Sequence, residues 1–242
     1  MKVIRPNCRV QFTAEDIAFV LQVLSPGTDT NPALVSLLTD EDSRDHILDD
    51  ERLYQALLQG TGCLRVSSHL YFYVLVRHVL RKAGIEDRRV ADYVAELLAE
   101  FSRLERIHLQ LTADFNPLEY LFEMLAALQQ ADERTCFLIR AHIGNHSLFL
   151  SGVFPERIRH RAEMKGFPDL SYYEGLGRSS YRVASDHRLA QRYELAPVFS
   201  TLSECFHETR QALNNLADRL FHLGDSHRSD ALLVKAFAKP KT

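Results

Sequence analysis

The chain has 242 residues and a formal net charge of −3, so it carries no overall basic charge that would attract nucleic acid or anionic lipid. Its residues are 46% hydrophobic and 25% charged, a balance that argues against a disordered chain and is typical of a folded globular protein. The sequence contains no apolar run of about eighteen residues and no signal-peptide pattern. We therefore expect a cytoplasmic protein without a membrane span.

The four cysteines, Cys8, Cys63, Cys136 and Cys205, are widely separated along the chain. None of them forms a Cys-x-x-Cys pair, which excludes a zinc knuckle and a thioredoxin-type motif. Cys136 and Cys205 lie in apolar helical patterns and are predicted to be buried thiols.

The first part of the chain predicts short helices divided by proline and glycine. Residues 1–12 are expected to be irregular, and Thr13 is the predicted N-cap of a helix that ends at Pro26. The acidic run 39–51 is interpreted as a solvated helix start, because it lacks the glycine and the spaced acids of a calcium loop. Short helices are expected on either side of this run.

Stronger helical patterns follow. A helix that begins at Ser67 or Ser68 is apolar on nearly all sides and is expected at the centre of the domain. Another helix is predicted over residues 87–109, and further helices are expected at Pro117 and after the N-cap Asp132. No strand pattern is evident, so the sequence predicts an all-α fold.

Leucine and phenylalanine side chains alternate at spacings of four and three over residues 195–223, with Thr209 as the polar exception. The positions that share this seam are Leu195, Phe199, Leu202, Phe206, Leu213, Leu216, Leu220 and Leu223. The pattern predicts one long helix, packed lengthwise in a bundle or against a partner helix. We therefore expect a homo-oligomer or a complex with a protein partner.

Glycine interrupts otherwise helical patterns in the stretch from residue 134 to residue 187, where it costs roughly 1 kcal/mol relative to alanine. The close approach of another helix or of a ligand would explain these positions. Gly175 and Ser179 would form a small-residue face, and tight helix packing is the favoured interpretation. The four positions concerned are Gly144, Gly152, Gly175 and Gly177.

His142 and His146 lie four residues apart and are therefore expected on one helix face, at least partly buried. They could be buried imidazoles with hydrogen-bond partners, ligands of a metal or haem, or part of a polar small-molecule pocket. A third metal ligand is not evident, and the glutamate of a zinc-protease motif is absent. No cofactor is expected. The other candidate pocket residues are Asn145, Tyr172, Tyr173, Arg178 and Tyr181.

Glu204 and His207 have the Glu-x-x-His spacing of di-iron bundle proteins, and Glu208 adds a carboxylate. A second such pair is missing. The register of the leucine seam also places these three side chains away from the core, so a solvated face is the favoured interpretation.

Arginine followed by histidine after a short spacing is typical of small helical RNases of the HEPN type, which use the pair for acid–base cleavage. Many arginines and histidines make such spacings common by chance, and a surface with no net basic charge is a poor one for RNA. Arg182 and His187 have the better context, just before the predicted long helix. The pairs are Arg103–His108, Arg140–His146 and Arg182–His187.

Arg157, Arg159, His160 and Arg161 form a local basic cluster. Arg188 and Arg192 follow later in the sequence. A solvated face is the simpler interpretation, and a binding site for an anion or an acidic partner is the functional alternative.

The segments Gly144-Asn145, 148–156, 172–181 and 196–206 resemble an uncharacterised bacterial family of all-helical proteins. The resemblance covers about residues 134–206. It implies a bacterial, cytoplasmic origin, and it implies no catalytic residue because no activity is established for that family.

Together these patterns predict one all-α domain over residues 1–242, a bundle of about nine or ten helices with a long C-terminal helix and irregular ends at 1–12 and 237–242. The leading functional hypothesis is a non-enzymatic interaction or regulatory module that self-associates. The alternatives are a ligand-, metal- or haem-binding protein or enzyme with a pocket at His142, His146 and Tyr173, or a HEPN-like RNase that uses Arg182 and His187.

Overall fold

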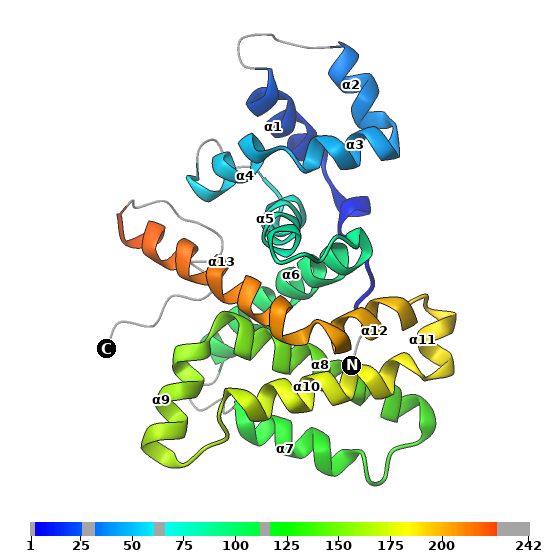
Figure 1. The fold of residues 1–242 in the computed structure, drawn as a ribbon, viewed down its shortest axis with the longest axis vertical. Helices are drawn as coiled ribbons and strands as arrows, with labels where there is room; N and C mark the ends of the chain where they lie inside the picture. The colour runs from blue at the N-terminus through cyan, green and yellow to red at the C-terminus, as the bar shows by residue number, and fades with distance from the viewer. Residues whose placement is uncertain (1–2, 26–31, 61–65, 112–116, 227–242) are drawn as a thin grey trace. The chain divides into compact units, whose positions relative to one another are not determined.

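A computed structural model describes residues 3–25, 32–60, 66–111 and 117–226 (Figure 1). Within these ranges all regular secondary structure is helical, which confirms the predicted all-α class. The described residues form thirteen α-helices and one short 3-10 helix, more than the nine or ten expected. The count is higher because the acidic run forms a helix of its own and the predicted long C-terminal helix is divided.

The elements, in chain order, are the 3-10 helix η1 (Arg9–Gln11), α1 (Ala14–Leu24), α2 (Pro32–Thr39), α3 (Glu41–Leu48), α4 (Glu51–Leu58), α5 (Ser68–Lys82), α6 (Arg88–Leu111), α7 (Pro117–Ala127), α8 (Glu133–Val153), α9 (Pro155–Lys165), α10 (Leu170–Ser185), α11 (Arg188–Arg192), α12 (Ala196–Glu204) and α13 (Phe206–Ser226).

The predicted N-caps are confirmed. The side chain of Thr13 accepts a hydrogen bond from the backbone N–H of Asp16, whose carboxylate accepts one from the N–H of Thr13 in return. Ser67 caps α5 and Asp132 caps α8 with one bond each, in which the side chain accepts from the backbone N–H of the residue three positions later. Each cap satisfies an N–H group that has no partner inside its helix, which is why these residue types mark the helix starts.

The chain divides into two compact units. Unit 1 comprises Met1–Arg5 and Glu100–Ala217, and unit 2 comprises Pro6–Ala99 and Asp218–Thr242. The organisation of the chain as one domain stays a prediction. The side chains of Cys63, Leu223 and residues 237–242 lie outside the described residues.

Unit 2 is organised around α5, as its apolar sequence predicted. Leu70, Phe72, Leu75 and Leu80 of this helix are all buried. The carboxylate of Asp16 accepts hydrogen bonds from both the backbone N–H and the hydroxyl of Ser67, at 2.7 and 2.6 Å. These bonds join the start of α5 to α1, although Asp16 and Ser67 are 51 positions apart in the sequence.

Two carboxylates of the acidic run do not lie on a solvated face, so that interpretation was wrong for them. Asp45 is buried and accepts two hydrogen bonds from the guanidinium of Arg9, at 2.6 and 2.7 Å. Asp49 is half-buried and pairs with Arg77, at 3.0 Å, and with Arg88, at 2.8 Å. The carboxylates neutralise arginines inside unit 2, and buried charges are stable only when paired in this way.

The segment before α1 is also more ordered than expected. It contains η1, and the backbone N–H of Arg9 donates to the buried carboxylate of Asp92 at 2.9 Å. The thiol of Cys8 is buried and donates to the carbonyl of His69 at 3.2 Å. Burial and the nearby acids raise the pKa of Cys8 well above its ordinary value, so this thiol stays protonated.

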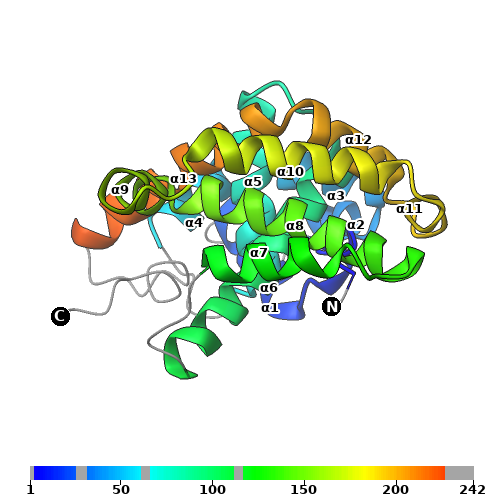
Figure 2. The same ribbon diagram turned by 90° about the horizontal axis from the view of Figure 1, so that it is seen from below.

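Unit 1 is built on the pair α8 and α10, which lie side by side in both views (Figure 1 and Figure 2). Glycine permits this close approach. A Cβ atom at Gly144 would lie 2.8 Å from two ring carbons of Tyr181, and one at Gly177 would lie 2.9 Å from the Cβ of Ser147 and against the ring of Phe206. Tight packing is therefore the reason for these glycines.

The prediction was wrong for Gly175 and Ser179. Both are exposed, and a Cβ at Gly175 would meet no atom within 4 Å. Gly152 follows the expected pattern, because a Cβ there would lie 3.1 Å from Leu213. The small-residue face of α10 is thus the one that contains Gly177 and Ser180.

The predicted continuous helix over residues 195–223 is broken at Cys205. The backbone of Cys205 (φ −102°, ψ 31°) leaves the helical region between α12 and α13. The hydroxyl of buried Thr209 donates to the Cys205 carbonyl at 2.8 Å, a contact that is known to bend helices. The seam residues from Leu195 to Leu220 are nevertheless buried within one copy of the chain. Between Leu195 and Leu220 the described seam residues therefore offer no open face to a second copy, and self-association stays a prediction without this support.

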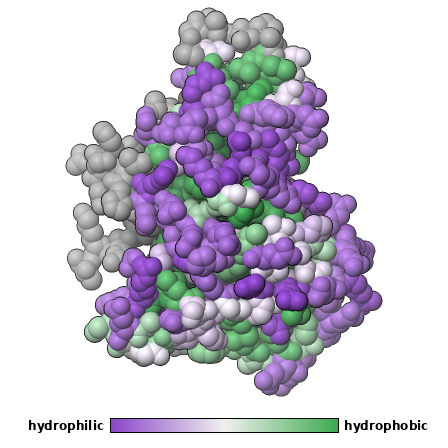
Figure 3. Space-filling view, in the orientation of Figure 1, coloured by the Kyte–Doolittle hydropathy of each residue, from purple (hydrophilic) through white to green (hydrophobic). Residues whose placement is uncertain are grey.

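No helix in the described ranges is both long and apolar enough to cross a membrane. The face drawn in Figure 3 is largely hydrophilic, with smaller hydrophobic areas between the polar residues. The large apolar side chains that are exposed in unit 1 are Phe122, Met164, Tyr172 and Val183.

Candidate functional site

His142 and His146 lie on one face of α8, as predicted, and they pack against an aromatic side chain of the same unit. Their ring centroids are 6.2 Å apart, and that of Phe101 in α6 lies 5.7 Å from His142 and 6.2 Å from His146. Burial lowers the pKa of His142 to about 4. Its imidazole is therefore neutral at pH 7.

A metal site at these histidines gains no further ligands. Within the described part of the chain, no three His, Cys, Asp or Glu residues are grouped as a metal ion would require. The contacts of both rings with Phe101 indicate that they contribute to the packing of unit 1.

Tyr181 and Asn145 form a buried hydrogen bond between α10 and α8. The tyrosine hydroxyl donates to the Asn145 side-chain oxygen at 2.7 Å, and both residues are buried. The ring of Tyr181 stacks on Phe199, with 5.4 Å between centroids. These two candidate pocket residues are thus part of the core that joins the helices of unit 1.

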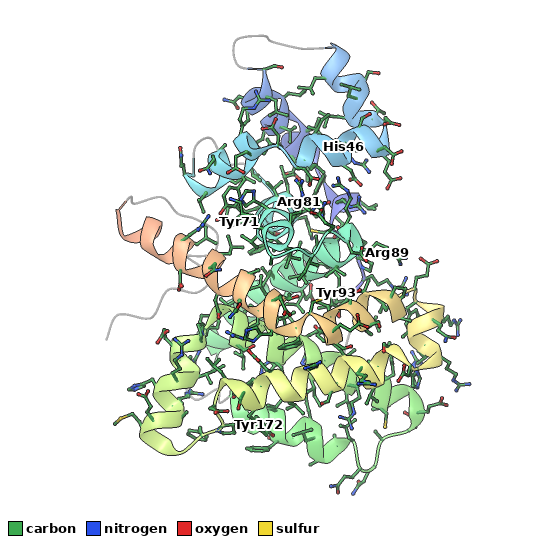
Figure 4. The ribbon with its side chains drawn as sticks, in the orientation of Figure 1. His46, Tyr71, Arg81, Arg89, Tyr93 and Tyr172 are labelled. Atoms are coloured by element: carbon green, nitrogen blue, oxygen red, sulfur yellow. The ribbon has the colours of Figure 1, made fainter. Side chains whose placement is uncertain are left out.

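The remaining pocket candidates do not gather around the histidines. Tyr172, near the N-terminal end of α10, is exposed (Figure 4). Arg178 is also exposed on α10. Tyr173 is buried and lines a different recess, described below. The residues predicted to form one pocket therefore lie in different places. The histidines pack against Phe101, Asn145 and Tyr181 form a hydrogen bond in the core, and Tyr173 lines a surface recess.

His187 has a structural role at the start of α11. Its Nδ1 atom accepts a hydrogen bond from the backbone N–H of Leu189 at 3.1 Å, which makes the histidine the N-cap. Its ring stacks on Phe137 at 5.1 Å, and its Nε2 atom lies 3.6 Å from a carboxylate oxygen of Glu133. With Nδ1 accepting, Nε2 carries the proton and points toward an acid.

This geometry does not favour the HEPN-like pair. Arg182 is exposed in the last turn of α10, while the imidazole of His187 is used for capping and stacking. Arg140 and His146, six positions apart on α8, lie on different faces of that helix. The side chains of Arg103 and His108 lie outside the described residues.

The Glu-x-x-His residues face away from the core, as predicted. Glu204, His207 and Glu208 are all exposed. His207 lies 3.1 Å from a carboxylate oxygen of Glu174, and Glu204 accepts a hydrogen bond from Ser200. The imidazole is therefore engaged by Glu174 at the surface.

A recess in unit 1 brings together two features that the sequence showed only separately, the basic cluster of α9 and Tyr173 of α10. Pro155 sets the start of α9, and Gly166, in the left-handed conformation (φ 62°), ends it. Because they are four residues apart, Arg157 and Arg161 lie on the same side of this helix. The recess is lined by Leu150, Phe154, Arg157, Ile158, Arg161, Phe167, Pro168 and Tyr173.

We call this site the arginine recess. Burial and the charge of Arg157 lower the pKa of Arg161, and the Tyr173 hydroxyl opposes the effect. Burial raises the pKa of Tyr173, so its phenol stays protonated and can donate a hydrogen bond. Arg157 makes no ion pair with any residue that the structure describes. The site thus combines an apolar floor with two cations that repel each other.

Met164 extends the same side of α9. It follows Arg157 by seven positions and Arg161 by three, so it lies along the same helix face. Its side chain is 70% exposed. A thioether is a flexible, adaptable contact group at binding surfaces. The face thus offers an apolar contact beside the two guanidinium groups.

Comparison with protein-family models, with curated proteins and with solved structures found no match to this chain. The resemblance of residues 134–206 to an uncharacterised bacterial family therefore stays a prediction.

Sequence patterns missed the ion pairs of unit 2 and the joining of α9 to Tyr173. The partners in these contacts are far apart in sequence; Arg9 and Asp92, for example, are separated by 83 positions. The two predicted buried thiols, Cys136 and Cys205, are only half-buried. The one local signal for the recess was the density of arginine between Pro155 and Gly166.

Proposed function

We propose that the protein is a non-enzymatic interaction module that recognises an acidic segment of a protein partner through the arginine recess of unit 1. One observation supports this most directly. Arg157 and Arg161 stand on the same side of α9 beside an apolar floor, and Arg157 has no carboxylate partner among the described residues. A carboxylate from outside the chain would remove the repulsion between the guanidinium groups.

The chemistry of the site defines the partner. Charge-assisted hydrogen bonds from guanidinium to carboxylate are stronger than neutral ones and can be bidentate. The recess has a volume of only about 20 Å³, room for a single water molecule, so the partner would lie across its mouth, with an apolar side chain on the apolar lining and acidic residues beside the guanidinium groups. The net charge of −3 disfavours a polyanionic nucleic acid as the natural partner.

A fluorescence anisotropy titration tests this proposal. The probe is a fluorescein-labelled peptide in which glutamate alternates with phenylalanine and leucine, and it is compared with a peptide that has lysine in place of glutamate. We expect saturable binding of the acidic peptide only, weakened by added salt. Because a hydrogen bond to a charged group contributes about 1.5–3 kcal/mol, Arg157→Glu combined with Arg161→Glu is expected to weaken binding more than about tenfold.

Arg159→Glu is the matched control. Arg159 lies on the same helix, is exposed and already pairs with Glu156. That exchange is expected to leave the affinity within about twofold, whereas Arg157→Glu alone, which changes the net charge by the same amount, is expected to weaken binding. Equal effects of Arg159→Glu and Arg157→Glu would show that general charge, and not the recess, attracts the peptide.

A further inference from the structure

A second cavity of unit 1 lies between the N-terminal half of α8 and the C-terminal end of α10, and its volume is about 220 Å³. Leu128, Phe137 and Val183 supply apolar walls. Cys136, Arg140 and His187 supply the polar groups. None of these residues lines the arginine recess, so the two sites are separate.

The volume sets the size of a possible occupant. An apolar cavity of about 150 Å³ is large enough for one benzene molecule. The cavity at Arg140 therefore has room for a compact apolar body of that size together with one small polar group. It is too small for a nucleotide or a long acyl chain, since sites for drug-sized ligands begin at roughly 300 Å³.

The charge of the lining favours an anion. Arg140 makes no ion pair or side-chain hydrogen bond with any residue in the described ranges. Glu133, which lies 3.6 Å from Nε2 of the lining residue His187, is already paired with Arg188 at 2.7 Å. The guanidinium of Arg140 is thus the cation at this cavity that still lacks a described counter-ion.

The thiol in the lining does not indicate covalent chemistry. The Sγ atom of Cys136 donates to the backbone carbonyl of Ala131 at 3.4 Å. A thiol held as a donor is a poor nucleophile, because the reactive form is the thiolate. The cavity is therefore a place for reversible binding.

We propose that this cavity binds a small organic carboxylate with a compact apolar body, such as an aromatic acid. The carboxylate pairs with the guanidinium of Arg140. The body of the ligand lies between the ring of Phe137 and the side chain of Val183. Such a ligand satisfies the charge and fills the apolar space at the same time, which neither an inorganic anion nor a neutral hydrocarbon does.

Ligand-observed fluorine NMR with 4-fluorobenzoate tests the proposal on the full-length protein. We expect saturable line broadening that unlabelled benzoate reverses. Benzamide, which has the same shape without the charge, is expected to compete at least tenfold more weakly. Acetate and inorganic phosphate, which lack the apolar body, are expected not to compete at equal concentration.

Arg140→Gln is expected to weaken 4-fluorobenzoate binding at least tenfold, whereas Arg134→Gln is the matched control. Arg134 is an exposed arginine on the same helix and does not line the cavity. Circular dichroism confirms that each variant keeps its helices. A second variant, Val183→Trp, alters an exposed wall position and is expected to reduce binding by filling the cavity.

Several results would overturn the proposal. They are the absence of saturable binding, equal competition by benzoate and benzamide, and an unchanged affinity in Arg140→Gln. The double variant Arg157→Glu with Arg161→Glu is expected to bind 4-fluorobenzoate normally, so failure of this site and failure of the arginine recess are distinguishable. A signal lost in that double variant would instead place the benzoate at the arginine recess and overturn the assignment to Arg140.

Discussion

Both units pair buried arginines with carboxylates, as Arg210 is paired with Glu174 in unit 1, but the units differ in the arginines that line their recesses. In unit 2, the guanidinium groups of Arg9, Arg77 and Arg88 are paired with Asp45 and Asp49 inside the structure. Arg77 is only 3% exposed. The carboxylates neutralise these charges within the folded protein, since a buried guanidinium without its carboxylates would be strongly destabilising.

Unit 1 is held together mainly by close packing. Gly144 and Gly177 allow helices to approach, and Tyr181 donates a hydrogen bond to Asn145 across them. Arg140 and Arg157 line a cavity and a recess and have no described carboxylate partner. The density of arginine in a sequence is therefore not itself a sign of function. What distinguishes a binding site is a cation that the fold leaves without a counter-ion.

The largest expected effect tests this contrast directly. Arg77→Ala removes a guanidinium that donates to Asp49 at 3.0 Å and to the carbonyl of Glu86 at 2.7 Å. We expect a loss of about 3 kcal/mol in the free energy of unfolding, because Asp49 keeps Arg88 but loses its bond to Arg77, and the Glu86 carbonyl loses a charged donor. Arg157→Ala is expected to change stability by less than about 0.5 kcal/mol. Urea denaturation measures both, and similar losses in the two variants would remove the distinction between the units.

The two units are also expected to respond to pH in opposite directions. Burial lowers the pKa of His142 in unit 1 to about 4, so its contribution to stability is present above its unfolded pKa of about 6.5 and is lost as the pH falls through 4. The loss is at most about 3 kcal/mol. His142→Gln is expected to reduce the acid sensitivity, measured as the free energy of unfolding between pH 7 and pH 4 relative to the parent protein.

Asp92 in unit 2 gives the opposite sign. Burial raises the pKa of Asp92 to about 6, against the opposing effect of Arg9. Its contribution is therefore fully present below its unfolded pKa of about 3.9 and is lost as the pH rises through 6. Asp92→Asn is expected to gain stability relative to the parent between those pH values. A variant whose stability difference from the parent does not change with pH would contradict the assignment.

The smallest expected changes in stability distinguish Gly175 from Gly177, two glycines of α10 that the sequence alone does not distinguish. Gly177→Ala is expected to cost about 1–3 kcal/mol, because its Cβ would meet Phe206 and Ser147. Gly175→Ala is expected to stabilise the protein by about 0.5–1 kcal/mol, since no atom lies within 4 Å and alanine is the better helix former. Thermal unfolding of both variants gives the comparison, and a loss in Gly175→Ala would mean that α10 is packed on its other face.

Local features were predictable from the sequence. The N-caps Thr13, Ser67 and Asp132 were recognised because a cap depends on residues only two or three positions away. The shared face of His142 and His146 followed from helical spacing in the same way. The break at Cys205 was missed, because the apolar seam continues across it and periodicity does not record a change in backbone direction.

The sequence by itself determined the all-α class, most helix starts and the presence of a basic cluster on α9. Only the tertiary structure decided which arginines are neutralised. Arg9 and Asp45 are 36 positions apart, and Tyr173 reaches the recess from a different helix than Arg157. The reason is physical: capping and helical periodicity act over a few residues, whereas the pairing of charges and the closing of a cavity depend on contacts that the chain makes only when it is folded.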